Sequence, residues 1–167
     1  PHDVAIENAV RYLLSRQSED GGIKSTAYGV LRPGAATTAL VLYALSHLDE
    51  KALEPHQDQI AKANEFLLLG LREHGKVCAP DGTLDYPTYG AAMWFVADAR
   101  IGLGLKTVQR EDLIHWILEA QLDEEHGIER DNVQYGGWDL EATSGAKGDQ
   151  LKGTNISITS FALEALW

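Results

Sequence analysis

Two kinds of helical segment alternate along the chain. In the first kind, apolar residues recur at helical spacing on one side and polar residues occupy the other side, as in an amphipathic helix. These helices are predicted over residues 4–17, 56–74 and 110–122. In the second kind nearly every position is small or aliphatic, and a helix that is apolar all round is normally buried. These segments lie at residues 35–48, 89–103 and 155–167.

Because strand signals are nearly absent, the alternation predicts an all-α protein built as an array of three helical hairpins. The amphipathic helices would lie outside, and the apolar helices would line the concave inner side. We place the repeats approximately at residues 1–53, 54–108 and 109–167 of a single domain.

A shared motif supports this division. It starts at residues 9, 63 and 113, so that Tyr12, Phe66 and Trp116 align. A period near 50 residues is typical of stacked repeat units. Each copy leads toward a glycine-containing break, which we place at residues 18–22, 79–83 and 136–138.

Composition narrows the range of partners. The net charge of −11 disfavours binding to nucleic acid, because phosphate backbones are also negative. No stretch approaches the roughly 20 apolar residues that a transmembrane helix needs. The one cysteine, Cys78, leaves the cellular compartment undecided. Since the chain starts at Pro1 and stops at Trp167 inside an apolar pattern, we expect it to be a piece of something longer.

The repeat resembles a known family. Tyr12-Leu-Leu-Ser-Arg-Gln17, then Asp20-Gly-Gly22 and a buried helix ending Ala44-Leu45, is similar to the repeat of terpenoid cyclases and protein prenyltransferase β-subunits. This resemblance implies an α/α toroid, here about half of an (α/α)6 barrel. The other half would come from a second toroid half or from a homo-oligomer. The resemblance also implies that Gln17 and Gln121 bond backbone groups at neighbouring helix ends.

The catalytic signatures of the family are altered. Cyclases of this family use an Asp-x-Asp-Asp acid, and no such tetrapeptide occurs in the chain. The prenyltransferases hold zinc with an Asp and a Cys two residues apart and with a later His. The counterpart of the first pair is Asp85 and Pro87, and the segment 153–156 has no histidine. We therefore expect neither chemistry in this segment.

Candidate site residues lie in the loops before the inner helices and on those helices. Helix N-termini at the mouth of a toroid point N–H groups at whatever binds there. The candidates for ligand binding are Tyr43, Asp85, Tyr86, Tyr89, Trp94, Trp138 and Asn155, and the weak catalytic candidates are Asp85 and Asp139, with Glu141 nearby. The competing interpretation is structural: Asp85 and Asn155 cap helices, and the aromatic residues pack loops and core.

Other chemistry has little support in the sequence. No nucleotide-binding or other cofactor motif is evident. The densest acidic run, residues 123–131, has oxygen ligands that calcium prefers, but its spacing matches no EF-hand, and we assign no metal site.

Three functions remain open. The leading one is a segment lining an apolar cavity for a hydrophobic small molecule, isoprenoid-like by the resemblance. The alternatives are a non-catalytic interaction scaffold and a fragment of a carbohydrate-active (α/α)6 enzyme. The last would use two carboxylates such as Asp85 and Asp139 at a defined separation.

Overall fold

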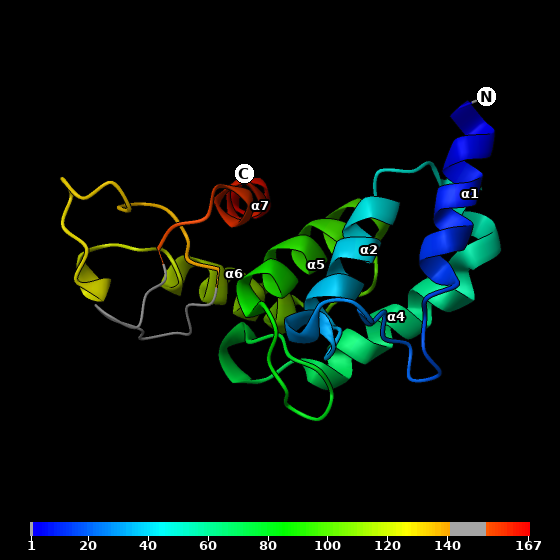
Figure 1. The fold of residues 1–167 in the computed structure, drawn as a ribbon, viewed down its shortest axis with the longest axis horizontal. Helices are drawn as coiled ribbons and strands as arrows, with labels where there is room; N and C mark the ends of the chain where they lie inside the picture. The colour runs from blue at the N-terminus through cyan, green and yellow to red at the C-terminus, as the bar shows by residue number, and fades with distance from the viewer. Residues whose placement is uncertain (1, 141–152) are drawn as a thin grey trace.

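The protein is described by a computed structural model that covers residues 2–140 and 153–167, and Figure 1 shows it as a ribbon. The longer helices are α1 (His2–Leu14), α2 (Ala35–Leu45), α4 (Gln57–Gly70), α5 (Pro87–Ile101), α6 (Thr107–Glu119) and α7 (Ile156–Leu166). The short ones are α3 (Glu50–Leu53), η1 (Gly29–Leu31), η2 (Glu54–His56), η3 (Glu73–Gly75) and η4 (Glu124–His126). The described residues form isolated β-bridges but no strand, and the all-α prediction is confirmed.

Helix α5 is at the centre of the packing. It contacts α2 on one side and α7 on the other, and these three helices form an inner layer (Figure 1). Helix α4 packs against α2, and α6 packs against α5, so these two belong to an outer layer. Helix α1 projects from the end of the molecule beyond α2 (Figure 1), and of its side chains only Val10 and Leu14 are buried.

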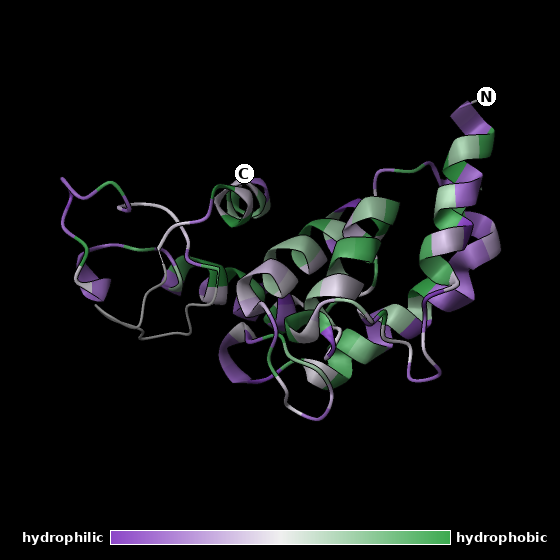
Figure 2. Ribbon diagram, viewed as in Figure 1, coloured by the Kyte–Doolittle hydropathy of each residue, from purple (hydrophilic) through white to green (hydrophobic). Residues whose placement is uncertain are grey.

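The hydropathy of the helices follows this division into layers. Figure 2 shows α2 mostly in the colours of apolar residues, whereas α1 and α4 carry both polar and apolar faces. The core includes α2 side chains such as Leu42 and Leu45, which are fully buried with Trp94 of α5 and Phe66 of α4. The burial of α2 and α5 therefore agrees with the pattern read from the sequence. Helix α7, also expected to be buried all round, instead leaves Ile156 89 % and Leu163 59 % exposed.

Several helix ends differ from the prediction. The second outer helix was expected to reach His74, but α4 ends at Gly70. The backbone of the following segment lies against Gly70, where a Cβ would stand 1.8 Å from the Cys78 carbonyl oxygen. The third outer helix begins at Thr107, earlier than expected, because the Gln109 side chain accepts the backbone N–H of Lys106.

The same turn follows each outer helix. An isolated antiparallel bridge joins Gln17 to Ile23, Leu71 to Val77 and Gln121 to Trp138, at positions that align between the repeats. Each turn holds one glycine with positive φ at the same place, namely Gly21, Gly75 and Gly136. The common period in the sequence therefore corresponds to a common local structure.

The second turn corrects one expectation. We placed the break of the second repeat at residues 79–83, but the equivalent of Gly21 is Gly75. The residue before it, His74, has φ 61°, a left-handed conformation that is uncommon for a side-chain-bearing residue. Residues 79–83 form a separate turn, in which the N–H of Ala79 donates to the Thr83 carbonyl at 3.0 Å.

Each turn is tied to the inner helix that follows it. The Thr38 hydroxyl of α2 accepts the N–H of Ile23 at 2.8 Å, and the Thr159 hydroxyl of α7 accepts the N–H of Trp138 at 3.2 Å. In the second repeat the corresponding position is Gly90, whose Cβ would stand 2.9 Å from the Val77 side chain. These contacts join each turn to the inner helix that follows it.

Candidate functional site

Aromatic side chains from all three inner helices meet on one side of α5. Tyr43 of α2 lies 5.1 Å from Phe161 of α7, ring centroid to centroid, with the rings nearly perpendicular. Tyr89 of α5 lies 5.6 Å from the same Phe161, and Tyr86 lies 6.1 Å from Tyr89. All four side chains are half-buried, so part of each ring stays open to solvent. We call Tyr43, Tyr86, Tyr89 and Phe161 the aromatic wall.

A polar network holds one end of the aromatic wall. The Tyr43 hydroxyl donates to Glu164 Oε2 at 2.7 Å, and Arg100 Nη2 donates to Glu164 Oε1 at 2.7 Å. Arg100 also contacts Nδ1 of His47 at 2.9 Å, and His47 packs edge-on against Tyr43. Burial, followed by the hydrogen bond to Glu164, raises the pKa of Tyr43. The Glu164 carboxylate thus links α7 to both α2 and α5.

These bonds join the two helices that flank α5. The side chains of Tyr43 and Glu164 meet beside α5, although they are 121 residues apart in the chain. Aromatic faces gathered in this way offer apolar contact area and attract cations through their ring quadrupoles.

The aromatic wall contains three of the candidate residues taken from the sequence, Tyr43, Tyr86 and Tyr89. Two residues of this region were not among the candidates: Phe161 of the aromatic wall, and Glu164, which bonds to Tyr43. Their spacing of three residues on α7 puts both on one helix face. His47 follows the end of α2 and packs edge-on against Tyr43. The spacing on α7 was the only sequence signal for Phe161 and Glu164, and it does not predict which helix faces contact each other.

Trp94 lies away from the aromatic wall. Its side chain is 0 % exposed, and its indole N–H donates to Asn64 Oδ1 of α4 at 2.8 Å. Asn64 in turn donates to the Leu103 carbonyl at 3.0 Å. The ring is thus enclosed between the inner and outer layers, and its role in this structure is that of a core residue.

Asp85 caps a helix of the neighbouring repeat. The buried carboxylate accepts the N–H of Ala36, in the first turn of α2, at 2.9 Å and its other oxygen accepts the N–H of Tyr86 at 2.8 Å. Burial raises the pKa of Asp85, while these backbone donors oppose the shift. Since both oxygens are engaged by backbone groups, the structure does not favour Asp85 as one of a pair of glycosidase carboxylates.

The candidates of the third repeat also make structural contacts. Trp138 is buried, and its indole N–H donates to the Ile117 carbonyl at 2.7 Å. The buried Asp139 accepts the N–H of Gly153 at 2.7 Å. Asn155 caps α7, as the structural interpretation predicted, and accepts two backbone N–H groups of its first turn. Glu141 lies outside the described residues.

Gln17 is a structural tie, as the resemblance implied. Its side-chain amide donates to the Gly21 carbonyl at 3.0 Å and to the Gln59 carbonyl of α4 at 2.8 Å. Gln121 donates to the Gly136 carbonyl at 2.9 Å in the third turn. The middle repeat has Leu71 in this position and lacks the amide.

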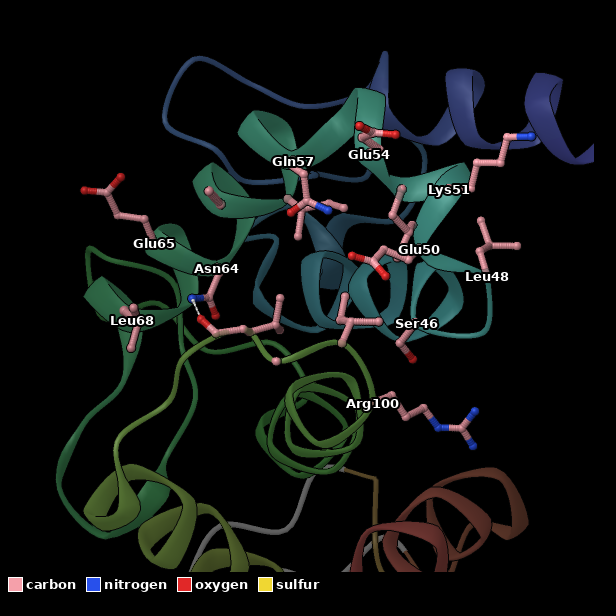
Figure 3. Close-up of a pocket in the computed structure, with 16 residues that line it drawn as sticks. Ser46, Leu48, Glu50, Lys51, Glu54, Gln57, Asn64, Glu65, Leu68 and Arg100 are labelled. Carbon is pink, nitrogen blue, oxygen red and sulfur yellow. Dashed lines mark hydrogen bonds between the residues drawn. The ribbon is translucent and has the colours of Figure 1, made fainter.

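A hollow lies at the end of the molecule opposite to the glycine turns. It has a volume of about 1040 Å³ and lies between α4 and the C-terminal ends of α2 and α5 (Figure 3). Several charged side chains border it, among them Glu50, Glu54, Glu65 and Lys51. The candidate residues taken from the sequence do not line it. Its lining comes from helix ends far apart in the chain, so no local pattern could mark it.

The acidic run of the third repeat makes its own contacts. Glu124 accepts from Arg130 Nε at 2.6 Å and from the Tyr135 hydroxyl at 2.8 Å. The hydrogen bond from Arg130 is the main cause that lowers the pKa of Glu124 to about 2. Within residues 2–140 and 153–167, no three His, Cys, Asp or Glu side chains are grouped so as to hold a metal ion.

Comparison of the chain with protein-family models, curated proteins and solved structures gave no match. The resemblance to terpenoid cyclases and prenyltransferases therefore rests on the repeat residues. In the described part of the chain, the helices are too short or too polar to cross a membrane.

Proposed function

We propose that this chain is a prenyltransferase- or squalene-cyclase-like repeat segment whose aromatic wall forms part of an apolar ligand cavity. The observation that carries the proposal is the convergence of Tyr43, Tyr89 and Phe161 from three different inner helices. The substrate class, an isoprenoid-like hydrocarbon, comes from the family resemblance. Binding is proposed without catalysis, because the acid and zinc signatures of the family are altered in this sequence.

The chemistry of the wall suits an apolar ligand. Each aromatic ring carries a large apolar area, and removal of that area from water contributes roughly 25 cal/mol per Å². The half-buried rings leave part of this area for a ligand to cover. The tie between Tyr43 and Glu164 fixes one ring before binding, which lowers the entropy lost when a ligand orders the site.

The test is equilibrium binding of farnesol to the chain, compared between Tyr89→Ala and Tyr28→Ala. Tyr28 is an exposed tyrosine outside the wall and serves as the matched control. We expect saturable binding by the wild type and by Tyr28→Ala, and about tenfold weaker binding by Tyr89→Ala, equivalent to about 1.4 kcal/mol. Absence of saturable binding, or equal binding by both folded variants, would contradict the proposal.

The hollow of about 1040 Å³ favours a second candidate function, a protein-interaction scaffold. Its lining has apolar residues together with Glu50, Glu54 and Glu65, which outnumber the basic Lys51 and Arg100. Such a surface suits a basic amphipathic peptide. Calorimetry with a Lys/Leu amphipathic helix peptide tests this function. The scaffold predicts measurable binding that weakens in Glu54→Gln, and no binding heat with either protein would exclude this peptide class.

A further inference from the structure

The structure brings together two histidines that are 41 residues apart in the sequence. His74 lies in η3, the turn that follows α4, and His115 lies within α6. The centroids of the two imidazole rings are 6.3 Å apart, and the ring planes are inclined to each other by 49°. Both residues are exposed, so their rings are accessible from solvent. We call His74 and His115 the histidine pair.

A close backbone contact positions the histidine pair. A Cβ on Gly75, the residue after His74, would stand 1.9 Å from the Asp112 carbonyl oxygen of α6. Because Gly75 has no side chain, the turn lies directly on α6 at this point. Asp112 and His115 are three residues apart, and residues at this spacing share a helix face. The two histidines are therefore held near each other without a ligand, which lowers the entropy lost when one binds.

The backbone of His74 is unusual among the three repeats. Within the described residues it is the only non-glycine residue with positive φ, at φ 61° and ψ 28°. The first and third turns have Asp20 and Tyr135 in the corresponding position, and neither has positive φ. The repeat architecture therefore does not require the left-handed conformation. Backbone outliers of this kind cluster where proteins bind ligands.

A carboxylate lies beside one member of the pair. Nε2 of His115 is 3.1 Å from Oε1 of Glu119, which lies one turn further along α6. A proton on Nε2, directed at this carboxylate, leaves the lone pair of Nδ1 for a metal ion. Histidines that bind metals almost always direct their other ring N–H at a carboxylate, a carbonyl or a water molecule. His115 therefore has the carboxylate partner that is typical of a metal ligand.

The distance between the two rings fits one metal ion shared between them. Zinc binds an imidazole nitrogen at about 2.0–2.1 Å, so two rings on one ion have centroids about 5–6.5 Å apart, depending on the angle at the metal. The observed 6.3 Å lies within this range. Imidazole nitrogens suit Zn²⁺, Cu²⁺ and Ni²⁺, whereas Mg²⁺ and Ca²⁺ prefer oxygen ligands. The net charge of −11 also favours the approach of a cation.

We propose that the histidine pair binds one divalent transition-metal ion such as Zn²⁺, and that the ion joins η3 to α6. No group of three His, Cys, Asp or Glu ligands occurs among the described residues, so two imidazoles and water molecules form the coordination shell. Two protein ligands hold zinc more weakly than the three or four of catalytic and structural sites, and we expect micromolar affinity. The pair shares no residue with the aromatic wall, so the two binding proposals are tested separately.

Calorimetric titration of the chain with zinc chloride in a non-chelating buffer tests the proposal, with the variants His74→Asn, His115→Gln and His2→Gln. Asparagine tolerates a left-handed backbone, and glutamine is a good helix former. The first two substitutions therefore remove one imidazole each and keep the local backbone. His2 is an exposed histidine of α1 outside the pair, and it serves as the matched control.

We expect one zinc ion per chain, with a dissociation constant that rises at least tenfold in His74→Asn and in His115→Gln and changes less than twofold in His2→Gln. Because only the folded chain holds the pair together, zinc should raise the urea midpoint of the wild type and of His2→Gln alone. A large excess of Mg²⁺ should leave zinc binding unchanged. Absence of saturable binding, a loss in only one of the two pair variants, equal affinity in all variants, or displacement by Mg²⁺ would overturn the proposal.

Discussion

At the scale of single residues, Asp85 joins the first two repeats through a hydrogen bond to the backbone of α2. Its carboxylate lies at the first turn of α2, where backbone N–H groups are unpaired and the helix dipole is positive. Both effects favour a negative charge. Burial works against them and dominates, because the pKa of Asp85 is raised. The residue connects two repeats at a net electrostatic cost to its charged form.

We expect Asp85→Asn to lower the free energy of unfolding by about 1–3 kcal/mol at pH 7, since the amide group turns a donor toward a backbone N–H. The pKa of Asp85 is raised in the folded state, so the folded protein binds this proton more tightly than the unfolded chain. As the pH falls from the raised pKa of the folded state toward the ordinary aspartate pKa near 3.9, the wild type therefore gains stability relative to the variant. Urea denaturation across this pH range measures the difference in free energy of unfolding between the wild type and Asp85→Asn. A difference that shrinks as the pH falls would contradict this expectation.

The residue scale also shows what sequence can and cannot predict about a site. Asn155 was recognisable as a helix cap, because a cap lies next to the helix that it serves. Asp85 also has a capping role, but the helix is 49 residues away in the chain, and no local pattern reveals that. Likewise Trp94 and Tyr43 both read as aromatic residues on apolar helices. Only packing places Trp94 between the layers and Tyr43 on the open side.

At the scale of elements, the unit of this fold is an outer helix, its turn and the inner helix that follows. The turn glycine decides how closely the next outer helix can approach, because a carbonyl of that helix occupies the space of a Cβ. The sequence suggested residues 79–83 as the second turn, since Asp81-Gly82 resembles Asp20-Gly21. The structure instead uses Gly75, because α6 lies there. The contact between α6 and Gly75 is a tertiary contact, and the local sequence does not reveal it.

Substitution of these glycines separates backbone strain from helix approach. Gly75→Ala should lower the free energy of unfolding by about 3 kcal/mol, about 1 kcal/mol from the left-handed backbone and the rest from displacement of α6. Gly82→Ala should lower it by only about 1 kcal/mol, because Gly82 has a similar φ and open space. Denaturant titration of both variants gives the comparison. Equal losses would show that the turn does not set the position of α6.

At the scale of the whole molecule, the burial of α2 and α5 was predictable and the contacts between inner helices were not. An apolar helix is normally buried, so the positions of α2 and α5 follow from their composition. Which side chains of neighbouring helices touch depends instead on how those side chains interdigitate. For that reason the sequence gives no sign that Tyr43 and Phe161 are in contact. The candidate site and its proposed function depend on this contact.

The central claim is therefore that side chains of α2 and α7 meet beside α5. A double-mutant cycle with Tyr43→Phe and Glu164→Ala measures it, because the hydroxyl and the carboxylate form the bond between the two helices. The account predicts a coupling energy of about 0.5–1.5 kcal/mol in the free energy of unfolding. Additive effects, with a coupling below about 0.3 kcal/mol, would mean that the two helices do not meet.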